Sequence, residues 1–122
     1  MQSHRSSLAD YVRAIRSRQA AIDAHPVAMT HDGDAWSTRR ETITDYVFPD
    51  GAVLRCCEEE ELAASAQLPV GAAASPCGPV CHISWEVRHS NRTTAIHPMR
   101  ITFDSRCREA FWLRYHSDDA ER

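Results

Sequence analysis

The sequence of 122 residues contains no lysine, so all 14 of its basic side chains are arginines. Every cation is therefore a planar guanidinium group, which can pair with a carboxylate through two hydrogen bonds. The chain also lacks any apolar run that approaches the roughly 20 residues needed to cross a bilayer. Residues 1–7 lack the apolar core of a secretory signal. These absences predict a chain without a membrane-spanning helix, with the cytoplasm as the expected compartment.

Sequence motifs of the common enzyme classes are also missing. The four glycines form neither a G-x-G-x-x-G motif nor a phosphate-binding loop, and no G-x-S-x-G motif occurs. The seven histidines supply candidate bases, but no serine or cysteine lies in a recognisable setting for a nucleophile. The sequence therefore predicts a protein that is not an enzyme. An enzyme that pairs a cysteine with a histidine remains an alternative, and it requires an accessible thiol with a lowered pKa.

The charge is unevenly distributed along the chain, which has a formal net charge of −3. Residues 1–22 and 82–116 each carry a net charge of +3, whereas residues 23–81 carry −7. Such an acidic middle indicates either a molecule that neutralises itself, which is the commoner case, or a face that binds a basic partner. The overall balance excludes non-specific binding to nucleic acid, which requires a basic surface.

The stretch 36–57 predicts a β-hairpin. Segments rich in threonine, isoleucine, tyrosine and valine flank the sequence Phe48-Pro49-Asp50-Gly51-Ala52. Proline presets the first corner of a type I turn, and glycine takes the left-handed position that follows. These residues are typical of a three-residue loop with a glycine bulge.

Residues 7–24 predict an amphipathic helix that begins with Ser7 as its N-cap and ends before Pro26. Its apolar side chains recur at the spacing of a helix, at Leu8, Val12, Ile15 and Ile22. Such a stripe usually packs against the protein's own sheet. The alternative is that residues 8–22 form the interface of a homodimer or a partner contact.

The remaining elements complete a single α+β domain. We expect a polar turn at 27–34, a short helix at 58–68 and a loop at 69–81. Strands at 82–89 and 99–104 should form a second hairpin over 82–104. Residues 105–115 predict a helix rather than a fifth strand, and residues 117–122 a frayed acidic tail. This order predicts an antiparallel sheet of about four strands, covered on one face by the N-terminal helix.

The five cysteines support a second functional hypothesis, a zinc-stabilised structural or regulatory domain. Cys77 and Cys81 have C-x₃-C spacing and precede His82. The four ligands would be Cys77, Cys81, one of Cys56 or Cys57, and either His82 or Cys107. Without a second pair at matching spacing, we favour free thiols, some buried and some exposed, and no cofactor. We expect no disulfide framework in a cytoplasmic chain. Cys56 and Cys57 are neighbours on a predicted strand, so their side chains should face opposite sides.

The expected function is that of a small protein-binding module that acts as an inhibitor, adaptor or regulator. Small, acidic α+β chains with few motifs include many from bacterial mobile elements, among them inhibitors of host defence, and this comparison rests on size and composition alone. Tryptophan beside arginine is typical of interface anchors. The expected partner is a protein with a basic surface, and the expected contact residues are Glu58, Glu59, Glu60, Glu61, Trp36 and Trp112.

Overall fold

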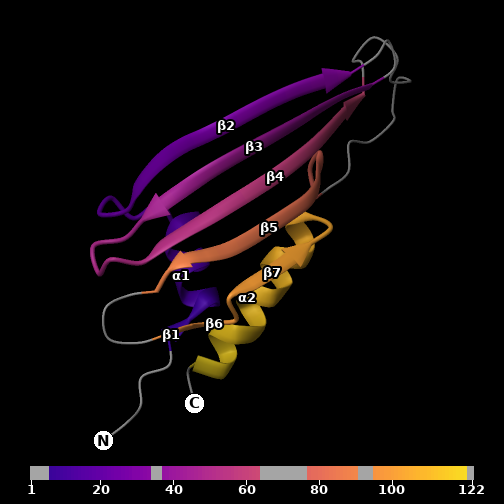
Figure 1. Ribbon diagram of the computed structural model, residues 1–122. Helices are drawn as coiled ribbons and strands as arrows, with labels where there is room; N and C mark the ends of the chain where they lie inside the picture. The colour runs from indigo at the N-terminus through magenta and orange to yellow at the C-terminus, as the bar shows by residue number, and fades with distance from the viewer. Residues whose placement is uncertain (1–5, 34–36, 64–76, 91–94, 121–122) are drawn as a thin grey trace, which may run out of the picture.

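The computed structural model describes residues 6–33, 37–63, 77–90 and 95–120 and has an α+β fold (Figure 1). The elements in chain order are β1 (Ser6–Ser7), α1 (Leu8–Arg16), β2 (Asp23–Gly33), β3 (Ser37–Val47), β4 (Val53–Ala63), β5 (Val80–His89), β6 (Ile96–His97), β7 (Arg100–Phe103) and α2 (Arg106–Ala120). None of the helices in these described ranges is long and apolar enough to span a membrane.

The main sheet has five antiparallel strands in the order β2-β3-β4-β5-β7, and β1 pairs with β6 in a separate parallel pair. The extra strand is β2. The expected turn at 27–34 is therefore wrong for residues 27–33, which pair with β3. All residues of β2 are exposed, so neither of its faces has the apolar alternation by which a half-buried strand is recognised in a sequence.

The hairpin between β3 and β4 has the expected turn. The Phe48 N–H donates to the Ala52 carbonyl at 2.9 Å, and the Gly51 N–H donates to the Phe48 carbonyl at 3.0 Å. Gly51 has a φ of 96°, in the left-handed region that glycine adopts without strain. Asp50 accepts a hydrogen bond from the Ala52 N–H at 2.9 Å, which fixes the loop further.

Helix α1 begins at the expected N-cap, where the Ala9 N–H donates to Ser7 Oγ at 3.1 Å, but it ends at Arg16 and not at residue 24. Arg18 stops it with a φ of 58°. The N–H groups of Arg18 and Gln19 donate to the carbonyls of Ile15 and Ala14, the bond pattern of a Schellman motif. Glycine is the usual residue at this position, and a side chain there costs about 1 kcal/mol. Arginine thus ends the helix without the expected sequence signal.

The expected helix at 58–68 is wrong over its first part, because β4 continues to Ala63. The sequence favours a helix here, since a run of glutamates suits a helix N-terminus. The register with β3 places Arg40 opposite Glu60 and Arg39 opposite Glu61. Oppositely charged pairs across two strands stabilise the extended form.

The core joins α1 to the central strands. Leu8 and Val12 are fully buried, as are Leu54 of β4 and Ile83 and Trp85 of β5. Helix α2 reaches the same core, because Glu109 of α2 accepts a hydrogen bond from Trp85. The helix expected at 105–115 is therefore present, but it begins at Arg106 and extends over much of the acidic tail, to Ala120. The loop expected at 69–81 ends earlier, because Val80 and Cys81 already belong to β5; residues 64–76 lie outside the described part.

A disulfide joins Cys77, just before β5, to Cys107 in the first turn of α2. The expectation of free thiols is therefore wrong for Cys77 and Cys107, while Cys56, Cys57 and Cys81 are free. Sequence spacing could not show this pairing, because the two cysteines are 30 positions apart and meet only when α2 packs beside β5. Disulfides are rare in cytosolic proteins. This bond opposes the expectation of a cytoplasmic location, which stays a prediction.

We expect the double substitution of Cys77→Ser and Cys107→Ser to destabilise the protein, since the bond restricts the unfolded chain. For a loop of this length the loss is roughly 3–4 kcal/mol in the free energy of unfolding, measured by denaturation in urea. Cys81→Ser is the matched control, because Cys81 is exposed and free. Equal stability of the double variant and the control would contradict a structural role for the bond.

Candidate binding surfaces

A buried carboxylate forms the polar centre of the fold. Glu109 of α2 is only 3% exposed. It accepts a hydrogen bond from Trp85 Nε1 at 2.7 Å and from Arg16 Nε at 2.7 Å, and the Arg16 guanidinium also lies 5.2 Å from the centre of the Trp85 ring. A buried carboxylate is tolerated only with such partners. One side chain thus connects α2 to both β5 and α1.

Glu58 of β4 extends this polar centre toward the surface. It pairs with Arg16 at 2.9 Å and with Arg106, the first residue of α2, at 3.0 Å. Burial by itself would lower the pKa of Arg16, but hydrogen bonds and charge attraction from Glu109 and then from Glu58 outweigh it and hold that pKa above its ordinary value. Arg16 is therefore a permanent cation inside the fold.

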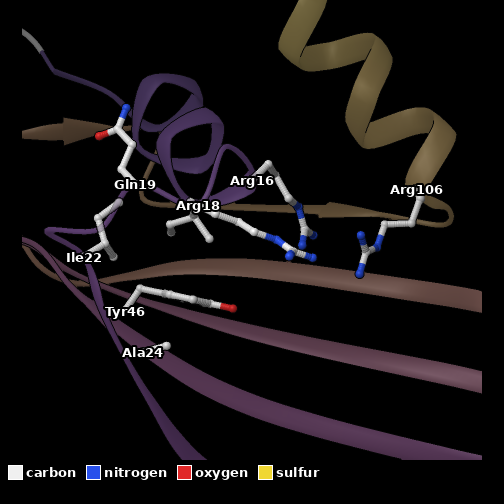
Figure 2. A pocket seen from close by; sticks show the side chains of 8 residues that line it. Arg16, Arg18, Gln19, Ile22, Ala24, Tyr46 and Arg106 are labelled. Carbon is white, nitrogen blue, oxygen red and sulfur yellow. The ribbon is translucent and has the colours of Figure 1, made fainter.

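A cavity of about 500 Å³ lies beside this centre, between the end of α1, the start of β2 and the start of α2 (Figure 2). Arg16, Arg18 and Arg106 line it together with Tyr46. In Figure 2 both helices lie on the same side of the strands, and the side chains of Arg16 and Arg18 extend toward that of Arg106, beyond the hydroxyl end of Tyr46. Burial raises the pKa of the Tyr46 phenol, so its hydroxyl remains a hydrogen-bond donor at neutral pH.

A second surface lies at the opposite end of the sheet. There the ends of β2, β3 and β4 run past both helices (Figure 1). We call residues 28–33, 38–42 and 59–61 the acidic arm, because they carry five carboxylates against two guanidinium groups. Its outer edge is β2, which pairs with β3 on one side and is exposed along its whole length. Met29, on this edge, is 66% exposed.

The four expected contact glutamates do not form one acidic patch. Alternation along β4 places Glu58 and Glu60 on the face toward the helices and Glu59 and Glu61 on the opposite face. Each lies near an arginine: Glu58 near Arg16 and Arg106, Glu60 near Arg40, and Glu59 and Glu61 near Arg39. The acidic middle of the chain is thus partly neutralised by its own arginines.

Of the two tryptophans expected as interface anchors, Trp112 lies in the described part of the structure. Trp112 is half-buried and packs against Phe103, with ring centres 5.2 Å apart, and against the core. Trp36 lies outside the described residues. The large exposed aromatic side chains of α2 are Phe111 and Tyr115, which the sequence pattern did not single out. The apolar stripe Leu8, Val12 and Ile15 is buried in the chain's own core.

The candidate zinc ligands are dispersed. Cys77 is bonded to Cys107, and Cys81 is exposed at an irregularity in the register of β5, where its Sγ donates to the Glu59 carbonyl at 3.5 Å. Cys56 is buried and Cys57 half-buried, as expected for opposite faces of β4, and burial is the main cause that raises the pKa of both thiols. Among the residues that the structure describes, no three side chains of histidine, cysteine, aspartate or glutamate are grouped to hold a metal ion.

Comparison of the chain with protein-family models, with curated proteins and with solved structures gives no match. The two surfaces are therefore the features of the molecule that indicate a function. Sequence analysis identified the arm only through its glutamates. It missed Arg16, Arg18, Arg106 and Glu109, since these residues lie far apart in the chain and carry no local motif.

We expect Glu109→Gln to destabilise the fold by roughly 3 kcal/mol, because it removes the charge that offsets Arg16 in a buried site. The measurement is the free energy of unfolding in guanidinium chloride. Glu86→Gln is the matched control, because its carboxylate is 41% exposed and pairs only loosely with Arg88, at 3.5 Å. A similar, small change in both variants would show that the buried centre is not essential to stability.

A pH-dependent pair lies on the face of the sheet opposite the helices. Arg55 donates two hydrogen bonds to Asp45, at 2.8 and 3.0 Å, and these bonds hold the pKa of that carboxyl below its ordinary value of 3.8. Since the folded pKa is the lower one, the pair stabilises the fold above about pH 4 and is lost as the pH falls through the folded pKa.

We expect a carboxyl NMR titration to place the midpoint of Asp45 below 3.8, and Arg55→Gln to raise it toward that value. Arg39→Gln is the control, because Arg39 pairs with Glu59 and Glu61 and not with Asp45. A wild-type midpoint at or above 3.8 would contradict the role given to the pair.

Proposed function

We propose that the protein is a non-enzymatic protein-binding module that acts as an inhibitor, adaptor or regulator. In this proposal, β2 accepts an extended, basic segment of a partner protein as an additional strand beside the acidic arm. The observation that carries it is the exposure of all 11 residues of β2, a strand that pairs on one side only among the residues that the structure describes. Long exposed edges of this kind are templates for strand addition.

The regular part of this edge is residues 28–33. Pro26 lacks an N–H group, and the register of β2 shifts between Pro26 and Ala28, so the first half of the strand is protected against pairing. From Ala28 to Gly33 the register with β3 is unbroken. The proposed docking edge therefore coincides with the acidic arm.

The charge of the arm selects the kind of occupant. Its excess of carboxylates favours a segment rich in arginine or lysine, and exposed Met29 favours an apolar side chain between them. A second copy of the chain is disfavoured as the occupant, because two acidic arms side by side would repel each other. The partner in this proposal is thus a different protein with a basic, extended segment.

The proposal treats the chain as one domain in which α1 covers the inner face of the sheet, since residues of α1 share one core with β4 and β5. An origin on a bacterial mobile element and a cytoplasmic location stay predictions from size and composition. Homodimerisation through residues 8–22 has less support, because the apolar side chains Leu8, Val12 and Ile15 are already buried.

We expect a fluorescein-labelled synthetic peptide of alternating arginine and valine to bind the protein, measured by fluorescence anisotropy at low salt. Met29→Lys should weaken this binding about tenfold, which corresponds to roughly 1.4 kcal/mol. The added charge repels the peptide at the docking edge. Met99→Lys is the matched control, because Met99 is 52% exposed and lies outside the arm.

Two further peptides separate strand addition from simple charge attraction. A peptide with glutamate in place of arginine should not bind, and a peptide N-methylated at alternate residues should bind far more weakly, because it cannot form the ladder of hydrogen bonds. Equal binding of the N-methylated and unmodified peptides, or equal losses in the two methionine variants, would rule out the docking edge.

A further inference from the structure

The cavity beside the polar centre has a composition suited to an anion, and the proposed strand addition does not use it. Three guanidinium groups, those of Arg16, Arg18 and Arg106, line one part of the wall. In the described part of the chain, two carboxylates pair with them, Glu58 and Glu109. One positive charge is therefore left without an opposite charge in this group.

That unbalanced charge belongs to Arg18. Among the described residues, Arg16 pairs with both carboxylates and Arg106 pairs with Glu58, whereas Arg18 has no ion pair. Arg18 nevertheless points toward the same part of the cavity as Arg16 (Figure 2). Like charges gathered at one place favour an anion between them.

The backbone of Arg18 supports the same reading. The residue lies at the left-handed position that ends α1, where glycine is the residue that relieves strain. Strained backbone held at a cavity is a feature of binding sites. An arginine at this position projects its side chain from the end of the helix into the cavity wall.

The first residue of α2 adds a donor. Arg106 Nε is buried and has no hydrogen-bond partner among the described residues, although the same guanidinium pairs with Glu58 through Nη2. A buried donor without an acceptor is unfavourable. A small rotation of this side chain toward a bound oxygen atom would satisfy it.

The rest of the wall is apolar or neutral. Ile22 and Ala24 lie on the side of β2, and the Tyr46 ring forms the floor in Figure 2. A cavity of about 500 Å³ holds more than a single inorganic ion. The apolar wall and the aromatic floor therefore fit a compact apolar group attached to the anion.

We infer that this cavity binds a small organic anion, a carboxylate or a phosphate monoester that carries an aromatic or short acyl group. The anionic oxygens accept hydrogen bonds from Arg18 and Arg106, and the apolar group lies between Ile22 and the Tyr46 ring. Binding in this cavity is separate from the acidic arm, which lies at the other end of the sheet.

The test is a titration of the full chain, followed by NMR of backbone amides and of arginine Nε–H groups. The probes are phenyl phosphate and benzoate, with benzamide as the neutral analogue and inorganic phosphate as the anion without an apolar group. We expect the shifts to cluster at residues 15–24, Tyr46 and Arg106. Phenyl phosphate or benzoate should bind at least about tenfold more tightly than benzamide and inorganic phosphate. The tighter of the two organic anions identifies the headgroup.

Arg18→Gly separates binding from stability. It should weaken the binding of the tighter probe about tenfold, because one charge-assisted contact is lost, and it should raise the melting temperature by about 4 °C, because glycine relieves the left-handed backbone. Arg18→Gln should weaken binding to the same extent without the rise. Arg88→Gln is the matched control, because it removes the same charge on a side chain that pairs with Glu86 and lies outside the cavity wall.

The inference is overturned if benzamide binds as tightly as both anions, or if inorganic phosphate binds as tightly as either of them. It is also overturned if the shifts lie outside the cavity, or if Arg18→Gly and Arg88→Gln weaken binding equally. A stabilised Arg18→Gly variant that still binds the probe like the wild type would show that the backbone at Arg18 serves only to end the helix.

Discussion

The burial of Glu109 is the constraint on which the rest of this structure depends. A carboxylate that is 3% exposed needs donors close to it, and Trp85 and Arg16 supply them from two other elements. When α2 packs against β5, Glu109 therefore has all of these donors only while α1 is in place, since Arg16 is on α1. Because Glu58 also pairs with Arg16, β4 is tied to the same centre. Four elements thus depend on one network of charged hydrogen bonds.

This centre lies toward one end of a long sheet, and its position divides the molecule. At the end where the helices pack, arginines outnumber the carboxylates that hold them, and a cavity remains beside them. At the other end the strands extend beyond both described helices, and β2 keeps an exposed edge (Figure 1). Both proposed binding surfaces follow from this packing arrangement. The cavity lies where arginine side chains are close together, and the docking edge of β2 lies where the strands extend beyond the described helices.

The use of arginine alone has a clear structural consequence. Arg16 and Arg55 each bind a carboxylate through two nitrogen atoms, and Arg39 and Arg40 lie opposite glutamates in the register of β3 and β4. A guanidinium group can serve two carboxylates at once, as Arg16 does, because its donors point in several directions. The chain can therefore keep an acidic segment inside a folded sheet and still leave the acidic arm with an excess of negative charge.

The sequence by itself determined the features that depend on near neighbours: the turn at Phe48–Ala52, the N-cap at Ser7, the buried face of residues 83–87 and an α+β fold. Only the tertiary structure decided that residues 23–33 form an edge strand, that Cys77 meets Cys107, and that Arg18 ends α1. It also brought the candidate sites together. Arg16 meets Glu58 across 42 positions and Glu109 across 93, and no local pattern records such pairings. Local sequence encodes turns and periodicity, whereas burial and charge pairing depend on which distant elements share a surface.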